Sequence, residues 1–394
     1  MAERDLDEML RRMSQTRVNR RSFLGAAGLA GSAAALAACT GGGTGSAAPP
    51  ASAGAGPTTA PAGDIENELF MYNWSLYIAP ENYEAFQEEF GVETFQYDTY
   101  ANNEELIAKL QGGASGYDIA SPTAEYIPGM VEEGFLAKLD LSRIPNAQYM
   151  NPKFKGLDWD PNFDYHIPKD YGTTGILYRG KLVPEPPQTW QQFYDQIIGG
   201  PLSGKTVFVD SMGDVFVFPL KMLGYSLNSV EKAELDEAHK ILMDVAPHIL
   251  ALDSDTYGNK MASEEAVAAL GWTGPLYQVL ATPETADSGY SLPSEGSLFW
   301  LDTWVMLAEA PHPNAAYAWL DFIHRPPVQA IETAYNGYAT PNDEAKKLVD
   351  PEILANVAVF PPEDTFDKLE GAEDTSSNNQ RLDIWAEFKD AIGG

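Results

Sequence analysis

The stretch LFMYNWSLYIAPENYEAFQEEFGVETFQYDTYANNEELIAKLQGGASGYDIA, residues 69–120, is the most informative about the fold class of this chain. Short β-rich runs in it alternate with runs whose apolar residues follow helical spacing. We expect a strand at 69–74, a helix at 81–90 that follows Pro80 and is ended by Gly91, a strand at 92–97, a helix at 104–111 capped by Asn103, and a strand at 117–120. This order favours an α/β domain with a largely parallel sheet.

A second block of alternating elements follows in the rest of the chain. Strands are expected at 172–178 and 206–209, and helices at 190–198, 216–223, 230–245, 263–270, 314–323, 327–335 and 381–391. The sequence contains no repeat of fixed period. Because the chain has 394 residues and a domain takes roughly 150, the sequence predicts two α/β lobes.

The composition is strongly acidic, with 57 Asp and Glu against 25 Lys and Arg and a net charge of −32. Nucleic acid is excluded as a partner, because neutralising phosphates requires clustered Lys and Arg. The single cysteine excludes a disulfide framework and a cysteine-based zinc site. The acidity has two interpretations: it steers polycations toward the protein, or, more plainly, it keeps the surface soluble or halotolerant.

The sequence lacks signatures of catalysis and of metal binding. The five histidines have no paired metal-ligand spacing, and no GxSxG elbow is present. Residues 199–206 match the phosphate-loop pattern, but an expected helix precedes them and a strand follows, which inverts the geometry that holds phosphate. Residues 253–264 nearly match a calcium loop, but Tyr257 is a poor ligand, so an acidic turn is favoured. We expect no metal, no cofactor and no enzymatic activity.

The first 38 residues are typical of an export signal. NRRSFL at 19–24 matches a twin-arginine signal, and the uncharged run that follows is too short for a membrane span of about 20 residues. The run ends in LAAC at 36–39, which resembles a bacterial lipobox, in which the cysteine, here Cys39, is lipidated. Residues 39–64 then form a flexible linker. We expect export by the twin-arginine (Tat) route and a lipid anchor at the outer face of the cell membrane.

Several aromatic residues lie at expected strand ends or in loops rather than at core spacing, namely Trp74, Tyr77, Trp272, Trp300 and Tyr338. Asp214 and Asp302 lie in similar segments, and strand alternation puts Trp300 and Asp302 on one face. Rings attract an organic cation by about 0.5–2 kcal/mol each, and carboxylates accept charge-assisted hydrogen bonds from ammonium. This set predicts a site for an organic cation; a sugar, or core packing for any single tryptophan, is the alternative.

From about Glu68 to Gly394 the chain resembles the spermidine/putrescine-binding proteins of bacterial ABC importers, which are extracellular solute-binding proteins of the type II periplasmic fold. Six pieces in family order carry the resemblance: YNWxxY at 72–77, GYD at 116–118 with Pro122-Thr123, DVF at 214–216, GWxG at 271–274, FWLD at 299–302 and GYxTP at 337–341. The resemblance implies two α/β lobes, joined by crossing strands, that close on a ligand by a hinge. The implied lobes are 65–172 plus 301–345, and 173–300 plus 346–394.

The resemblance also implies roles for individual residues. Trp74, Tyr77, Trp272 and Trp300 would line the alkyl chain of a polyamine, Asp302 and Asp214 would hold amines, Thr123 would hydrogen-bond the ligand, and Tyr338 would close the cleft. Two positions depart from the family pattern. Leu76 stands where several relatives place an acidic residue, and Glu125, which we include in the site, stands where an aromatic is common.

The implied function is capture of putrescine or spermidine by a monomeric lipoprotein that delivers the ligand to an ABC permease driven by a separate ATPase. Because of Leu76 and Glu125, another organic cation, an amino acid or a sugar stays open as the ligand. A secreted enzyme that acts on a cationic substrate with an Asp pair is the third, least favoured alternative.

Overall fold

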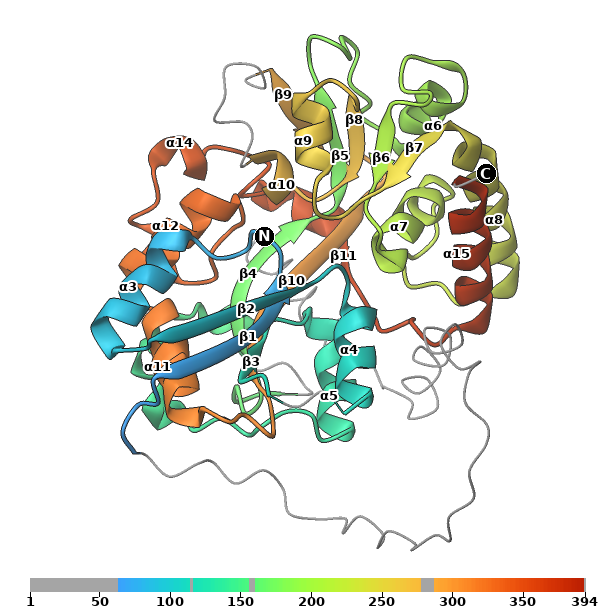
Figure 1. Ribbon diagram of the computed structural model, residues 1–394. Helices are drawn as coiled ribbons and strands as arrows, with labels where there is room; N and C mark the ends of the chain where they lie inside the picture. The colour runs from blue at the N-terminus through green and yellow to red at the C-terminus, as the bar shows by residue number, and fades with distance from the viewer. Residues whose placement is uncertain (1–62, 114–115, 156–159, 278–286, 393–394) are drawn as a thin grey trace, which may run out of the picture.

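The computed structural model describes residues 63–113, 116–155, 160–277 and 287–392, which form two β-sheets flanked by helices (Figure 1). The first sheet contains, in spatial order, β11 (Leu369–Gly371), β10 (Ser297–Met306), β3 (Ile119–Ala120), β1 (Glu68–Trp74) and β2 (Thr94–Tyr100), with β4 (Ile167–Thr173) paired to β10. The second contains β7 (Ile249–Leu252), β6 (Thr206–Phe208), β8 (Ala268–Gly271), β5 (Gly175–Arg179) and β9 (Ser288–Ser291). The predicted mixed α/β fold is confirmed.

Strand β1 lies inside the first sheet, between β3 and β2, and side chains on both of its faces are buried. It pairs in parallel with β2 and β3. Its side chains alternate, so that Leu69 and Met71 join one hydrophobic cluster with Trp304, while Tyr72 joins another with Leu106. A parallel strand covered on both faces needs apolar residues on both, which explains the nearly continuous apolar run at this point of the sequence.

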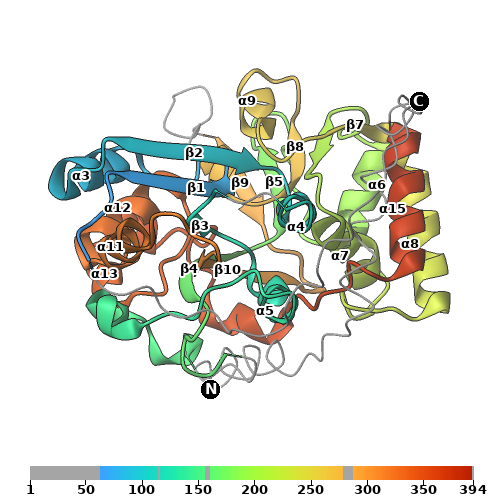
Figure 2. The same ribbon diagram turned by 60° about the horizontal axis from the view of Figure 1, so that its bottom comes forward.

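Helices cover both faces of the first sheet, as Figure 2 shows. On one side lie α3 (Pro80–Phe90), α11 (Pro313–Ile323) and α12 (Pro326–Asn336); on the other lie α4 (Asn103–Gln111) and α5 (Ile127–Glu132). Proline begins three of these helices because its missing N–H costs nothing in the first turn. Gly91 ends α3 at a φ of 71°, a conformation that glycine adopts without strain, as the sequence predicts.

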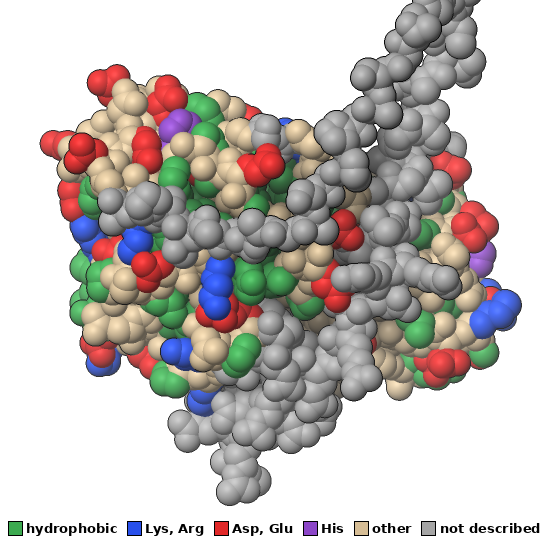
Figure 3. Space-filling model, turned by 90° about the horizontal axis from the view of Figure 1, so that it is seen from below, with side chains coloured by type: hydrophobic (Ala, Val, Ile, Leu, Met, Phe, Trp, Pro, Cys, Tyr) green, Lys and Arg blue, Asp and Glu red, His purple; other side chains and the backbone are tan. Residues whose placement is uncertain are grey.

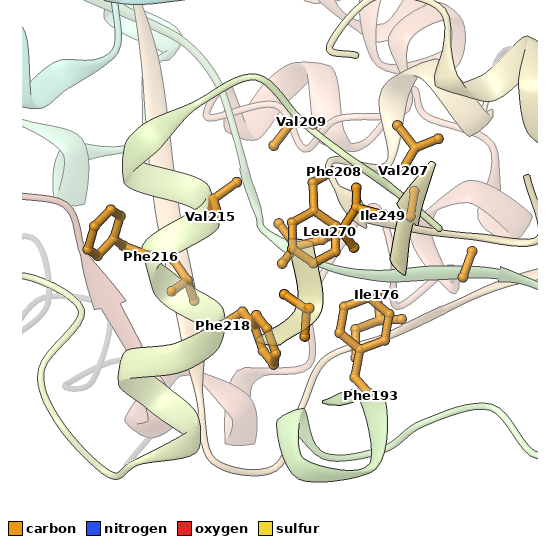
Figure 4. Close-up of a cluster of buried hydrophobic side chains, with 14 of the residues drawn as sticks. Ile176, Phe193, Val207, Phe208, Val209, Val215, Phe216, Phe218, Ile249 and Leu270 are labelled. Atoms are coloured by element: carbon orange, nitrogen blue, oxygen red, sulfur yellow. The ribbon is translucent and has the colours of Figure 1, made fainter. Parts of the chain in front are cut away.

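The second sheet is packed against α6 (Trp190–Gly199), α7 (Met212–Met222), α8 (Lys232–Val245) and α15 (Asn379–Ile392). Figure 4 shows Phe193 of α6 and Phe218 of α7 directed toward Phe208 of β6. The three ring centroids lie 5.8–6.1 Å apart. Helix α7 is apolar on nearly all sides and its residues Val215–Leu220 are fully buried. This packing fixes the amino end of α7, where Asp214 lies.

Strands β4 and β10 connect the regions of the two sheets. The sequence predicts one strand at 172–178, but the structure divides it at the buried Thr174 into the end of β4, in the first sheet, and β5, in the second. Strand β10 pairs antiparallel with β4 over 299–304 and with β3 at residues 305 and 306. It runs obliquely from the first sheet toward the second (Figure 1). The molecule thus has an antiparallel pair of strands between its two sheets.

Two local predictions are wrong. The helix expected at 263–270 is absent, because the small apolar residues Ala268–Gly271 form β8, which is fully buried between β5 and β6. A short apolar run does not distinguish strand from helix by its period, and pairing with two neighbours decides here. The cap of α4 is Asn102, whose side chain accepts from the Glu105 N–H, whereas Asn103 turns its amide to Thr123.

The remaining helices are short: α9 (Tyr257–Ala262), α10 (Gly274–Tyr277), α13 (Asp343–Lys346) and α14 (Pro351–Leu354). In the part of the chain that the structure describes, none of the helices combines the length and apolar character that a bilayer crossing requires. The predicted signal (1–38), Cys39 and the linker up to residue 62 lie outside the described residues. The lobe boundaries stay a prediction; β11, which comes from the 346–394 segment, pairs with β10.

Candidate ligand-binding site

One cavity of about 960 Å³, open solvent at its mouth included, is lined by every residue that the sequence predicts for the site. These residues are Trp74, Tyr77, Thr123, Glu125, Asp214, Trp272, Trp300, Asp302 and Tyr338. They come from segments that are up to 264 positions apart in the chain. The structure brings them together, and their role in binding stays a prediction.

The position of the cavity follows from the topology of the sheets. Trp74 ends β1 and Thr123 follows β3, and these are parallel strands of the first sheet. Asp214 follows β6 and Trp272 follows β8, which are parallel strands of the second sheet. Ligands of open α/β sheets bind outside the carboxyl ends of the strands, and here two such ends face one cavity.

Aromatic rings from both sheets form the walls of the cavity. The rings of Trp74 and Trp272 lie 5.9 Å apart at 70°, and Trp74 donates from Nε1 to the Ser121 carbonyl at 2.8 Å. Trp300 and Tyr338 lie edge to face at 4.8 Å and 87°. These contacts hold the rings in defined orientations in the walls of the cavity.

Asp302 is a buried carboxylate at one end of the cavity, on the same face of β10 as Trp300. Its Oδ2 accepts the Tyr77 hydroxyl at 2.5 Å, and Thr123 lies opposite it in a β-bridge. Burial raises the pKa of Asp302 to about 7, and the negative charge of Asp170 adds to the shift. Near neutral pH this carboxyl therefore exchanges between its neutral and charged forms.

A charged pair that the sequence analysis missed lies behind Asp302. The Lys169 Nζ is 2.6 Å from Asp170 Oδ2 and 3.3 Å from the centre of the Tyr77 ring, and both charged side chains are buried. The Tyr77 hydroxyl bridges Asp170 and Asp302 at 2.5 Å each. Two adjacent charged residues inside an otherwise apolar strand, IPKDYGT at 167–173, are the signal that could have identified this pair.

Asp214 is held by neutral donors at the amino end of α7. The Trp272 Nε1 donates to Oδ1 at 2.9 Å and the Ser211 hydroxyl to Oδ2 at 2.6 Å, and the Thr174 hydroxyl also donates to Oδ1. Ser211 is the N-cap of α7, so Asp214 lies in the first turn, where the helix dipole favours a negative charge. Burial nevertheless raises the pKa of Asp214.

Two glutamates line the cavity from the side of the first sheet. Glu125, which the sequence predicts, has an Oε2 that is buried and has no hydrogen-bond partner among the described residues. Glu104, which the sequence analysis missed, accepts the Tyr126 hydroxyl at 3.1 Å. Burial raises the pKa of both glutamates. Leaving a buried acceptor without a donor costs about 1–3 kcal/mol, so Glu125 is in a state that a cation would relieve.

The charge of the cavity has one sign. Carboxylates line it at Glu104, Glu125, Asp214, Asp255 and Asp302, and no Lys or Arg belongs to its described lining. Within the described residues, no group of three or more His, Cys, Asp and Glu side chains is arranged to hold a metal ion. Aromatic walls combined with spaced carboxylates suit a ligand with an apolar chain and positively charged ends.

At the mouth of the cavity, the half of the molecule that contains the first sheet contacts the half that contains the second sheet. The Ser75 hydroxyl, directly after β1, donates to Asp255 Oδ1 at 2.5 Å, and Asp255 lies just before α9 on the side of the second sheet. Leu76, the position that departs from the family pattern, is 55% exposed and has a φ of 51°. Leu76 therefore places an exposed apolar side chain at this edge of the cavity, and Asp255 is the acidic residue on the opposite side.

The chain is similar to known bacterial binding proteins. A putrescine/agmatine-binding protein of Pseudomonas aeruginosa is 32% identical over 339 residues, which cover 82% of this chain and 92% of that protein. A spermidine/putrescine-binding periplasmic protein of Escherichia coli is 31% identical over 318 residues, 80% of this chain and 89% of that one. The spermidine/putrescine ABC transporter substrate-binding protein PotD of Streptococcus pneumoniae superposes with a TM-score of 0.68 at 30% identity, over 82% of this chain and 99% of that one.

A lipoprotein of Treponema pallidum, TpPotD, superposes with a TM-score of 0.70 at 26% identity, over 82% of this chain and 99% of that one. The predicted resemblance and the predicted two-lobed fold are confirmed by these matches. The model of the family described as bacterial extracellular solute-binding proteins matches residues 81–361. The chain is therefore a member of the bacterial extracellular solute-binding protein family.

Proposed function

We propose that this protein captures a polyamine of the putrescine and spermidine class and delivers it to an ABC permease. The observation that carries the proposal is the cavity in which aromatic rings and carboxylates occur together without Lys or Arg in the described lining. Rings cover the methylenes of an alkylamine, at about 0.8 kcal/mol for each buried CH₂. The carboxylates accept hydrogen bonds from its ammonium groups. The relatives named for putrescine and spermidine support the same ligand class.

Isothermal titration calorimetry with putrescine, cadaverine, spermidine, lysine and glucose tests the ligand. We expect dissociation constants for the amines in the micromolar range, which corresponds to about −8 kcal/mol. Binding of glucose or lysine in place of the amines would overturn the proposal, as would the absence of heat and of a thermal shift with every amine.

We propose binding and transport, and not catalysis, as the task of the site. The named relatives are binding proteins, and the Asp302 and Asp214 carboxylates both contact donors of the protein itself. Incubation with spermidine followed by mass spectrometry should return unaltered amine. A product would favour the enzyme alternative.

Export and anchoring are the second part of the proposal and rest on the sequence. Residues 19–24 direct the chain to the twin-arginine route, and Cys39 carries the lipid. In cell fractions, Cys39→Ser should move the exported protein from the membrane to the soluble fraction. Changing Arg20 and Arg21 to Lys should retain it inside the cell. Unchanged fractionation of either variant would contradict that part.

The partner is the third part. We propose that a separate permease and a separate ATPase complete the importer. Among the described residues, no helix of this chain is suited to cross a membrane. The phosphate-loop match is preceded by a helix and followed by a strand, the reverse of the order that holds a nucleotide phosphate. Cells that lack the protein should lose uptake of labelled putrescine at micromolar concentration, and the intact gene should restore it. Uptake unaffected by the deletion would exclude this transport role.

A further inference from the structure

Glu125 differs from the other buried carboxylates of the cavity because it lacks a donor. Asp302 accepts the Tyr77 hydroxyl, and Asp214 accepts the Trp272 indole N–H. The Oε2 of Glu125 is buried, and no donor reaches it from the described residues. Because Glu125 lines the cavity, the missing donor can come from a bound ligand.

Glu104 lies on the same side of the cavity and adds a second negative charge. Its Oε1 accepts the Tyr126 hydroxyl at 3.1 Å, Tyr126 directly follows Glu125 in the chain, and all three residues line the cavity. Asp302 and Asp214 act on Glu125 through their charges as well. Glu125 therefore faces an excess of negative charge, which either a proton on its carboxyl group or a cation bound in the cavity offsets.

A ligand with two ammonium groups leaves part of this arrangement without a cation. Asp302 and Asp214 would take both groups, and the buried Oε2 of Glu125 would receive no ammonium. A third ammonium, placed along the same alkyl chain, supplies that donor and neutralises the Glu104 and Glu125 pair. A cavity of about 960 Å³, its open mouth included, has room for the longer chain.

Resting on the function proposed above, we propose that Glu125 and Glu104 form a third cation subsite, which makes the protein selective for triamines such as spermidine over diamines such as putrescine. This third subsite is distinct from the two formed by Asp214 and Asp302. It uses Glu125, one of the two positions at which the sequence departs from the family pattern.

Calorimetry with spermidine and with putrescine on the full-length chain and its Glu125→Gln variant tests the subsite. Hydrogen bonds to charged groups contribute about 1.5–3 kcal/mol, so the variant should bind spermidine at least about tenfold more weakly. Putrescine should bind within about threefold of the wild type, since the change removes only a distant charge. Glu104→Gln should act in the same direction and more weakly, because Tyr126 already donates to this carboxylate.

Glu133→Gln is the matched control: it removes the same charge from an exposed position nearby in the chain, outside the cavity, and should alter neither affinity. Retained putrescine binding shows that Glu125→Gln is folded. Equal weakening of both amines by Glu125→Gln, or no weakening of spermidine, would overturn the third subsite and leave the polyamine function standing. If the wild type binds neither amine, the proposed function fails, and the subsite with it.

Discussion

Asp302 links ligand binding to proton release through one buried carboxyl group. Its pKa in the folded state is about 7, raised by burial and by Asp170, whereas an unfolded aspartate titrates near 4. The folded apo protein therefore holds a proton on Asp302 at pH values at which the unfolded chain does not. The contribution of this group to stability is largest below about pH 4 and is lost as the pH rises toward 7.

We expect the affinity for putrescine to rise by up to about tenfold per pH unit between pH 5 and 7 and to level off above, because the ammonium binds the ionised carboxylate. Calorimetry at several pH values in buffers of different ionisation enthalpy would measure both the slope and the proton released. In Asp302→Asn the affinity should fall by about 1.5–3 kcal/mol and the slope should become shallower. An unchanged slope in this variant would assign the titration to another group; Asp390→Asn, an exposed position, serves as the control.

Gly172 sets the position of the Trp300 ring. A Cβ at residue 172 would lie 2.4 Å from Cζ2 of that ring, so alanine there must displace the tryptophan. We expect Gly172→Ala to cost about 1–3 kcal/mol of stability through overpacking. It should also weaken amine binding by several fold, as measured by thermal unfolding and calorimetry. Gly199→Ala, where nothing lies within 4 Å of the added methyl group, should change neither quantity as much.

At the scale of elements, the amino end of α7 holds the carboxylate of Asp214. The helix is buried along most of its length, and its cap Ser211 both accepts the Asp214 N–H and donates to Oδ2. Ser211 therefore has two tasks: it caps the first turn of the helix, and it orients the Asp214 carboxylate toward the cavity. Thr189 is the N-cap of α6 in the same way but does not line the cavity. Comparing changes at Ser211 and Thr189 therefore separates the effect of helix capping from the effect of orienting Asp214.

Ser211→Ala should destabilise the protein by about 0.5–2 kcal/mol through the lost cap and should also weaken amine binding. Thr189→Ala should cost a similar amount of stability and leave the affinity unchanged. Chemical denaturation gives the free energies of unfolding, and calorimetry gives the affinities. If both variants weaken binding equally, the cap acts only through stability.

The strands β4 and β10 fix the positions of the Asp170 and Asp302 carboxylates relative to each other. Their antiparallel pairing sets Asp302 directly opposite Asp170, and a shift of the pairing follows immediately after Asp302. Both carboxylates meet the hydroxyl of Tyr77, which comes from the loop after β1. Asp302, Asp170 and Tyr77 therefore meet where the two sheets are connected.

At the scale of the molecule, contacts across the cavity hold the two halves together. Trp74 meets Trp272, and Ser75 donates to Asp255, while β4 and β10 provide the connection between the sheets. Acidic side chains are spread over the described face of both halves rather than gathered at one place (Figure 3). On this face, that distribution favours a general effect on solubility over a single steering patch.

We expect Ser75→Ala to weaken amine binding by about 0.5–1.5 kcal/mol, the contribution of one hydrogen bond, because the closed arrangement loses a contact that the open one does not make. Stopped-flow fluorescence should record the loss mainly as faster dissociation. Ser203→Ala, an exposed serine on the side of the second sheet, is the control. A slower association with unchanged dissociation would contradict the role of Ser75 in closure.

The sequence by itself determined the local elements and the list of candidate site residues. Apolar spacing, Pro80 and Gly91 predicted α3 within a residue, because helix ends depend on local backbone preferences. Residues placed after short strands identified the aromatic and acidic side chains of the cavity, because parallel strand ends converge at one edge of a sheet. The resemblance supplied their order and the family.

Only the tertiary structure decided the rest. It turned the small apolar run at 268–271 into a central strand, because pairing on both sides outweighs helical propensity. It also brought Lys169 and Asp170 behind Asp302 and left Glu125 buried without a donor. These features depend on which residues meet across long distances in the chain, and local sequence carries no record of such contacts or of the burial that shifts the pKa values.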